Sequence, residues 1–303
     1  MKDFYSKIVK YKERPMIIRT GFFCSTWDNI LTTNRKIKLQ SLSHKRVIET
    51  FLKNLNDLKL LLELCKNNGF EVFRIGSNFV PFFSHKDFKD KWRYEIEDIL
   101  KSERKNITKY NIRLTMHPGQ FVVLNSPNPK VISESVREIE YHSFILDSLE
   151  TDQNSVIIIH TGGKYQDKQQ SIERFVKNVE KNVSLKKRIA IENDDKSFSA
   201  YDVLQISKFT GLPVVFDYYH HLLNPSEFDL YDLIKTWVNK IPKFHISSAG
   251  KRKYEHSDYL DRADFDEFKK LMFPLINTDI VIDVMPEVKM KEKAALIFLE
   301  WIK

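Results

Sequence analysis

Eight short apolar runs rich in β-branched residues recur along the chain, with segments of helical pattern between them. The runs lie at residues 16–23, 71–75, 112–116, 155–159, 188–191, 213–216, 243–246 and 279–284. Between them, apolar residues recur every three or four positions, as in 47–58 and 131–144, which indicates helices. Strands that alternate with helices form a parallel sheet, and eight such units close into a barrel. We therefore predict an α/β fold, the TIM (β/α)8 barrel.

Local signals place several helix boundaries, and the length supports one domain. Asn-Gly at 68–69 and Thr-Gly at 210–211 predict helix ends, and Asn-Pro at 128–129 predicts a helix start. The 303 residues, 42% hydrophobic and 30% charged, suffice for one large core, and no repeat or flexible linker divides them. We predict an N-terminal extension at 1–15 and a single barrel domain at 16–303.

Composition narrows the location and the chemistry. No apolar run is long enough for a transmembrane helix, and the first fifteen residues are charged rather than signal-like. We predict a cytoplasmic, nucleoid-associated monomer without a membrane segment. Cys24 and Cys65 are too far apart in the sequence to suggest a thiolate zinc site, so any metal must be held by nitrogen and oxygen. The net charge of +8 weakly favours a polyanionic partner.

Imidazoles and carboxylates gather where the predicted strands end. The residues concerned are His85, His117, His160, Glu192, Asp217, His220, His221, His245 and Glu287. The carboxyl ends of barrel strands share one face, where barrel enzymes keep their active sites. Such groups, buried together without a cation, would have a large desolvation cost. Together they favour a site for zinc, manganese or iron.

Taken singly, these residues have simpler interpretations. His117 could donate to a carbonyl of the Pro-Gly turn that follows it, Glu192 could cap a helix, and Asp217 could pair with Arg74. For each residue alone, we would prefer these simpler interpretations. Only the convergence of the residues on one face makes a shared metal site the better interpretation.

Two other histidines, His44 and His142, lie inside helical patterns, and we interpret them as structural. His220 and His221 are adjacent. In an extended backbone neighbouring side chains point to opposite sides, so we expect only one of the two to bind metal.

Seven segments, in this order, carry motifs of a known family: FRIGSNFVPFFSH (73–85), RLTMHPGQF (113–121), IIHTGGKYQDK (158–168), IENDDKSFSAYDVL (191–204), VVFDYYHH (214–221), KFHIS (243–247) and DVMPEVKMKEKA (283–294). They resemble the UV damage endonuclease family over most of the chain. The resemblance implies a barrel related to the apurinic endonuclease IV group, with up to three divalent metals, usually manganese. It also implies hydrolysis of the phosphodiester immediately 5′ to cyclobutane dimers and 6-4 photoproducts, with abasic sites as a further substrate.

The resemblance also implies roles for individual residues. The family's metal ligands correspond to His117, His160, Glu192, Asp217, His220, His245, His256 and Glu287. Lys243 corresponds to a lysine that can be carboxylated near the metals. His85 matches a motif histidine close to the metals, which would either support a ligand or act as an acid. The predicted catalytic residues are therefore Glu192, His85 and Lys243.

The implied partner is damaged double-stranded DNA. A photoproduct weakens base stacking, so the damaged nucleotides are easier to extrude from the duplex. Gln120 and Phe121 match the pair that the family inserts into the resulting gap, although Phe121 could instead be a core residue. On the loops after the fourth and seventh strands, five residues could hold backbone phosphates or be ordinary surface residues: Lys164, Tyr165, Lys168, Lys251 and Arg252.

Two other functions compete with this one. A metal-dependent sugar isomerase or epimerase of the xylose-isomerase-like class would share the barrel and the metal ligands, but it has no use for a Gln-Phe wedge. A DNA-binding protein without catalysis would need no intact ligand set. One departure from the family pattern is the turn after the first strand, where Phe23 and Cys24 replace a Tyr-containing sequence. The preference among these lesions is therefore left open.

Overall fold

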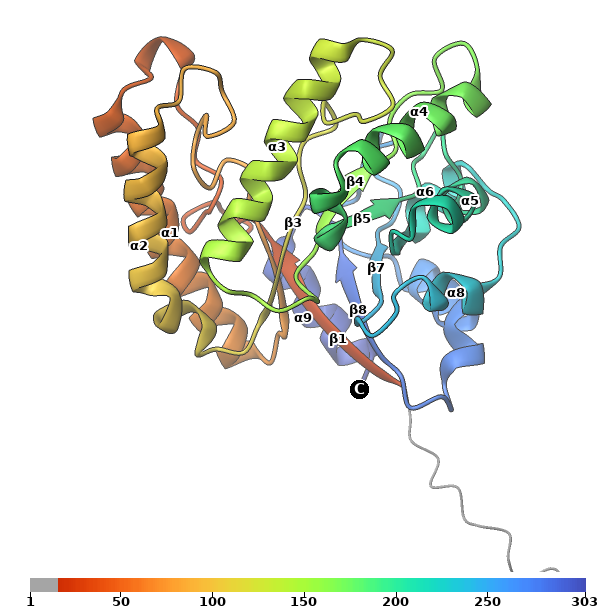
Figure 1. The fold of residues 1–303 in the computed structure, drawn as a ribbon. Helices are drawn as coiled ribbons and strands as arrows, with labels where there is room; N and C mark the ends of the chain where they lie inside the picture. The colour runs from red at the N-terminus through yellow and green to blue at the C-terminus, as the bar shows by residue number, and fades with distance from the viewer. Residues whose placement is uncertain (1–15) are drawn as a thin grey trace, which may run out of the picture.

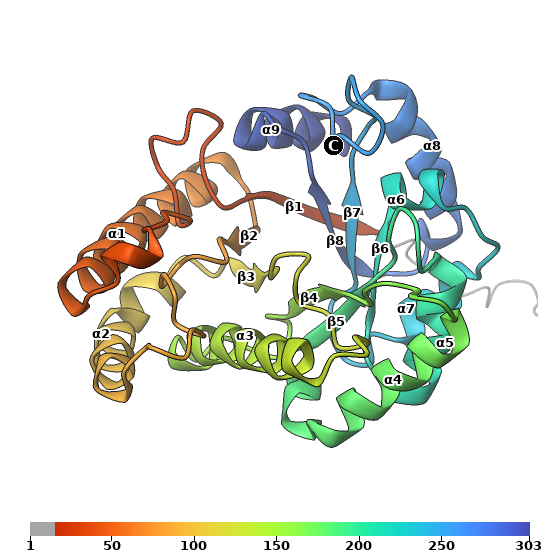
Figure 2. The ribbon, with the colours of Figure 1, turned by 90° about the horizontal axis from the view of Figure 1, so that it is seen from above.

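The computed structural model describes residues 16–303 and shows a closed barrel of eight parallel strands (Figures 1 and 2). The order of the strands around the barrel is their order in the chain, and β8 closes the barrel against β1. The strands are β1 (Ile17–Phe23), β2 (Val72–Ile75), β3 (Arg113–Met116), β4 (Ile157–His160), β5 (Ile189–Glu192), β6 (Val214–Asp217), β7 (Lys243–Ile246) and β8 (Val281–Pro286). The predicted TIM barrel is confirmed, whereas the predicted extension at 1–15 lies outside the described residues.

Helices surround the strands, as the view from above shows (Figure 2). They are α1 (His44–Asn68), α2 (Asp90–Thr108), α3 (Pro129–Ser148), α4 (Lys168–Lys181), α5 (Ala200–Thr210), α6 (Tyr218–Leu223), α7 (Leu230–Lys235), α8 (Arg262–Met272) and α9 (Lys291–Trp301), with 3₁₀ turns η1 (Leu39–Ser41), η2 (Val183–Lys187) and η3 (Phe273–Leu275). None of the helices in the described part of the chain is both long enough and apolar enough to span a bilayer.

The three predicted helix boundaries are confirmed, and each has a local cause. α1 and α5 end at Gly69 and Gly211, which adopt left-handed backbone angles with φ of 76° and 72°. α3 begins after Asn128, whose side chain accepts a hydrogen bond from the backbone N–H of Lys130. These caps fix where α1 and α5 end and where α3 begins.

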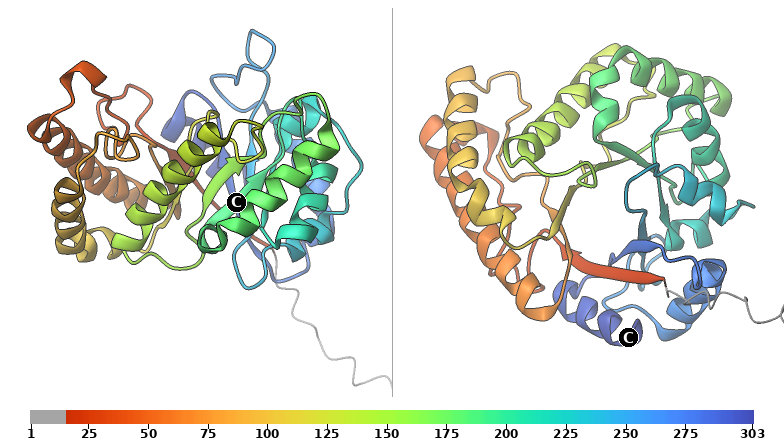
Figure 3. Two further views of the ribbon diagram at one scale, coloured as in Figure 1. Left: turned by 45° about the horizontal axis from the view of Figure 1, so that its top comes forward. Right: turned by 60° about the horizontal axis from the view of Figure 1, so that its bottom comes forward.

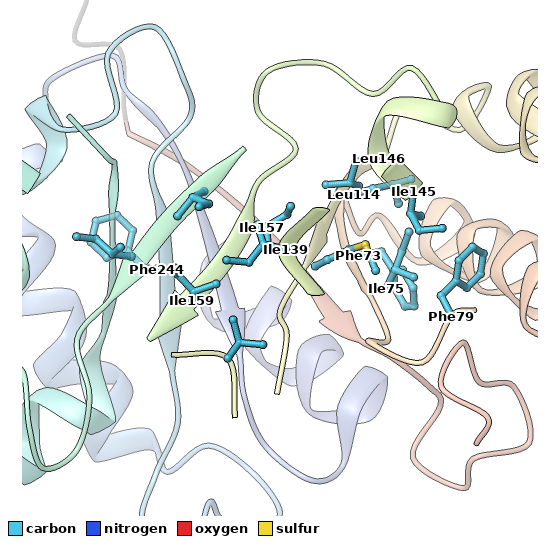
Figure 4. Close-up of a cluster of buried hydrophobic side chains, with 14 of the residues drawn as sticks. Phe73, Ile75, Phe79, Leu114, Ile139, Ile145, Leu146, Ile157, Ile159 and Phe244 are labelled. Atoms are coloured by element: carbon cyan, nitrogen blue, oxygen red, sulfur yellow. The ribbon is translucent and has the colours of Figure 1, made fainter. Parts of the chain in front are cut away.

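The main core lies between the strands and the helices. Figure 4 shows strand residues such as Phe73, Leu114 and Ile157 packing with Ile139 and Ile145 of α3. A second cluster uses alternate residues along neighbouring strands and therefore fills part of the barrel interior: Val156, Ile158, Ala190 and Val215. Trp237, from the segment after α7, packs with them.

Charged residues also lie inside the barrel, at the level where β1, β3 and β8 begin. Asp283 forms two contacts with Arg19, at 2.7 and 3.1 Å, and one with Arg113, at 2.5 Å. We call these three residues the ion-pair layer. In the strand register Lys243 lies beside Asp283, and Glu287 lies four residues further toward the carboxyl end. The layer therefore lies beneath the face where the predicted ligands gather.

Candidate metal centre

Most of the predicted ligands come from the carboxyl ends of six different strands and converge. Three groups have ligand atoms within 4.8 Å of one another: His117 with His160 and Glu192, Glu192 with Asp217 and His220, and Asp217 with His245 and Glu287. We call these seven residues the ligand cluster. Glu192 and Asp217 each belong to two groups, so the groups form a connected chain of three candidate sites.

Glu192 lies at the centre of the cluster and is buried. Its carboxylate is 3.0 Å from His117 Nε2, 3.6 Å from His160 Nε2 and 2.5 Å from His245 Nδ1. Burial alone would raise its pKa, but His245 and His160 hold the pKa of this carboxyl well below its ordinary value. The structure does not use it as a helix cap, because the side chain that caps α5 is Ser199.

Backbone carbonyls orient two of the imidazoles. His117 Nδ1 donates to the carbonyl of Pro118 at 3.0 Å, as the simpler interpretation required, and its Nε2 still faces Glu192. His220 Nδ1 donates to the carbonyl of Asn193 at 2.9 Å. When one ring nitrogen donates a hydrogen bond to a backbone carbonyl, the other nitrogen is the one that can bind a metal. This arrangement is typical of metal-ligating histidines.

The backbone around His220 differs from the prediction. It is not extended, because the Asp217 side chain accepts a hydrogen bond from the His220 N–H and starts α6 directly after β6. Only one of the adjacent imidazoles faces the cluster, as expected: His221 instead packs against Phe216 and Phe228, each with ring centroids 5.3 Å apart. That only one of the two binds metal stays a prediction, and the extended backbone from which it was argued is wrong.

His256 and Arg74 have other contacts than the sequence suggested. His256 bonds through Nδ1 to the backbone carbonyl of Glu287, and its ring lies 6.3 Å from that of His220. It borders the cluster without joining one of the three groups. Arg74 pairs with the Glu287 carboxylate, so the alternative that Asp217 pairs with Arg74 is wrong.

The other predicted catalytic residues lie in different places. Lys243 is completely buried one level below His245, and its Nζ has no hydrogen-bond partner among the described residues. Burial lowers the pKa of Lys243 to about 7. His85 borders a separate hollow of about 600 Å³, where its Nδ1 is 3.5 Å from Asp87 and its ring contacts Phe82.

The loop after β3 separates two hollows. Gln120 borders one of about 270 Å³, which also meets His160, His220 and His256; we call it the cluster hollow. Phe121 borders the larger hollow of His85. Phe121 is 69% exposed, so the alternative that it is a core residue is wrong.

The predicted phosphate-binding residues also differ from one another. Lys164, Tyr165, Lys251 and Arg252 are exposed, on the loops after β4 and β7. Lys168 begins α4 and is already paired with Asp202 at 2.5 Å.

Sequence reasoning missed Asn193, which follows Glu192 directly. Its side-chain amide donates to the carbonyl of Asp217 and accepts from the N–H of the same residue, both at 2.9 Å. It thereby joins the ends of β5 and β6 and fixes the spacing of the two shared carboxylates. The available signal was an amide side chain immediately after a predicted ligand.

Comparison with known proteins decides the family. The family model described as UV-endonuclease UvdE matches residues 17–302. The chain belongs to the UvdE family. A UV DNA damage endonuclease of Clostridium perfringens is 36% identical over 290 residues, which are 92% of this chain and 69% of that protein. The crystal structure of SacUVDE is 35% identical, with a TM-score of 0.84, and the match covers 94% of this chain and 99% of that one.

Membership in the UvdE family confirms the resemblance inferred from the seven motifs and makes the protein a DNA-repair endonuclease. A D-psicose 3-epimerase of Clostridium cellulolyticum H10 is 14% identical with a TM-score of 0.53, over 91% of this chain and 89% of that one. That likeness shows the fold alone and gives no support to the sugar-enzyme alternative.

Proposed function

We propose that this endonuclease hydrolyses the phosphodiester bond immediately 5′ to cyclobutane dimers and 6-4 photoproducts in double-stranded DNA, and that abasic sites are a further substrate. It would act as a monomer and use up to three divalent cations, with manganese as the expected metal. The observation that carries this proposal is the connected chain of three ligand groups sharing Glu192 and Asp217.

The residues present fit such cations. Every donor is an imidazole nitrogen or a carboxylate oxygen, the set that suits manganese, iron and zinc. Asp217 Oδ2, His245 Nε2 and His160 Nδ1 are buried and lack hydrogen-bond partners among the described residues. Buried polar atoms rarely lack a partner. A cation bound by the neighbouring ligands would be a partner for Asp217 Oδ2 and His245 Nε2.

Divalent cations, when bound there, would supply positive charge for the scissile phosphate and acidity for a water molecule. The ligands would be the seven residues of the cluster, with His256 beside them. Glu192 and Asp217 would each serve two cations and set their spacing. No protein nucleophile is required for hydrolysis.

Lys243 is proposed to be carboxylated. A neutral amine can attack carbon dioxide, forming an N–C bond and releasing a proton, and the result is an anionic carbamate. Burial beside His245 and an unpartnered Nζ support this, because a buried ammonium without a partner is unfavourable. Mass spectrometry of the intact protein at neutral pH, before and after acidification, would detect the loss of one carbon dioxide.

On the DNA side, Gln120 and Phe121 are proposed to enter the gap left by extruded nucleotides, and Lys164, Tyr165, Lys251 and Arg252 to contact the backbone. The exposed ring of Phe121 supports insertion, since an aromatic side chain can replace a lost base stack. Lys168 would contribute less because Asp202 already neutralises it. His85 is proposed to act near Phe121, either by supporting a neighbouring group or as an acid.

The direct test is incision of an end-labelled duplex with one cyclobutane dimer, with manganese and with EDTA, beside undamaged and abasic duplexes. We expect a single cut immediately 5′ to the dimer that disappears with EDTA. Binding without a cut in manganese would favour the non-catalytic alternative, and a cut at another position would contradict the proposed chemistry.

A further inference from the structure

The loop between β7 and α8 forms a short hairpin beside the ligand cluster. Ala249 and His256 make an isolated antiparallel bridge, and the Gly250 N–H donates to the carbonyl of Glu255 at 2.6 Å. Glu255 also pairs with Lys289 at 2.6 Å. Figure 3 shows this light-blue loop standing out above the barrel. The base of the hairpin is therefore fixed while its tip projects.

Tyr254 near the tip has an unusual backbone and unusual neighbours. Its φ of 68° lies in the left-handed region, which is rare for a bulky residue. Its ring centroid lies 4.0 Å from Lys196 Nζ and 4.9 Å from Lys253 Nζ. The ring thus holds two ammonium groups from different loops by cation–π contact.

Lys196 is placed by a well-ordered turn after β5. Asp194 accepts hydrogen bonds from the N–H groups of Lys196 and Phe198, at 2.8 and 3.0 Å. The contact between Lys196 and Tyr254 therefore joins two anchored loops. Both residues border the cluster hollow, together with Gln120 and the ligands His160 and His220.

The positive charges around the Tyr254 ring outnumber the carboxylates paired with them. Asp195 lies 3.5 Å from Lys196, whereas Lys253 has no carboxylate partner among the described ion pairs. Two ammonium groups near one ring repel each other, and an anion bound beside them would reduce that repulsion. An aromatic ring flanked by ammonium groups beside a phosphodiester-cleaving site suits a backbone phosphate.

We propose that Lys196 and Lys253, held by the ring of Tyr254, form a binding site for a DNA backbone phosphate next to the scissile bond. This inference rests on the proposed function, because it assumes that the strand enters the cluster hollow. Tyr254 is a positioning residue: it acts through the two lysines, and its ring rather than its hydroxyl group does so.

The test is the salt dependence of DNA binding, measured by fluorescence anisotropy in EDTA for the wild type, Lys196→Gln, Lys253→Gln, Tyr254→Ala and Tyr254→Phe. Each phosphate contact contributes about 0.9 to the slope of log affinity against log salt. We expect each lysine variant to lower the slope by about one. Tyr254→Ala should lower it as well, and Tyr254→Phe should restore the wild-type slope.

Lys208→Gln is the matched control, since it removes one exposed positive charge near the end of α5, away from the cluster. If the two lysine variants show the same slope as Lys208→Gln, the inference is overturned. Incision by the same wild-type preparation is measured in parallel. Incision with unchanged slopes refutes the inference alone. Lowered slopes without incision refute the proposed function, and with it the placement beside a scissile bond, while the two lysines remain phosphate contacts.

Discussion

The barrel interior holds two clusters of charged side chains, and they are completed in different ways. In the ion-pair layer, Asp283 is bound by Arg19 and Arg113. Burial alone would raise the pKa of Asp283, but the two guanidinium groups hold it below its ordinary value. In the ligand cluster, burial raises the pKa of Asp217, and its Oδ2 lacks a hydrogen-bond partner among the described residues.

The difference teaches how to distinguish a structural cluster from a functional one. Both contain buried carboxylates, so burial of charge alone does not identify a site. The ion-pair layer satisfies its carboxylate with the chain's own arginines, whereas in the ligand cluster Asp217 Oδ2, His245 Nε2 and His160 Nδ1 lack hydrogen-bond partners among the described residues. Only the second cluster requires something from outside the chain.

The largest expected effect is the loss of incision in Glu192→Gln. The change removes a carboxylate that two ligand groups share, so we expect kcat/KM on dimer-containing DNA to fall at least roughly a thousandfold. Circular dichroism should show an unchanged fold. Activity within about tenfold of the wild type would mean that Glu192 is not a shared ligand.

Asp283→Asn should affect stability rather than metal binding. It leaves the buried guanidinium of Arg113 and the half-buried one of Arg19 without their carboxylate, which costs about 3–5 kcal/mol of the free energy of unfolding. Urea unfolding measures this, with Asp266→Asn as the control because its pair with Arg262 is exposed. Equal losses in the two variants would contradict a self-contained ion-pair layer.

Phe121→Ala compares the end of the barrel that carries the ligand cluster with the opposite end. We expect preference for damaged over undamaged DNA to fall about tenfold, because one aromatic stack is lost, while stability stays unchanged. Phe209→Ala is the control, since Phe209 is equally exposed, at 68%, and lies at the far end of α5. A similar loss of preference in both variants would remove the wedge from the proposal.

The smallest expected effect concerns His142, which we interpret as structural. Burial lowers the pKa of His142 from 6.5 to about 4, while its Nδ1 donates to the Glu138 carbonyl. A pKa lowered by folding stabilises the protein above pH 6.5, and that contribution is lost as the pH falls toward about 4. Urea unfolding at about pH 7 and about pH 5 should show a larger loss for the wild type than for His142→Gln. Parallel losses would show that another group is responsible.

Much of the fold could be predicted because each local signal agreed with the others. Apolar runs rich in β-branched residues predicted strands whose observed limits differ by at most two residues, as for 155–159 against Ile157–His160. The ligands could be located because barrel strands all end on one face, so the sequence order of strand and polar residue translates directly into position.

The remaining features depend on tertiary contacts. Arg19, Arg113 and Asp283 are isolated charges flanked mostly by apolar residues, and their pairing across β1, β3 and β8 appears only when the barrel closes. The cation–π contact between Lys196 and Tyr254 joins loops 58 positions apart in sequence. The α6 helix was missed because Asp217, expected only as a ligand, also caps it.

The most direct test of the contrast between the two clusters is the number of manganese ions retained per chain, measured by elemental analysis after gel filtration. The account predicts up to three in the wild type, fewer in Glu192→Gln and an unchanged number in folded Asp283→Asn. Equal numbers in the wild type and Glu192→Gln, or no retained metal in the wild type at all, would contradict it.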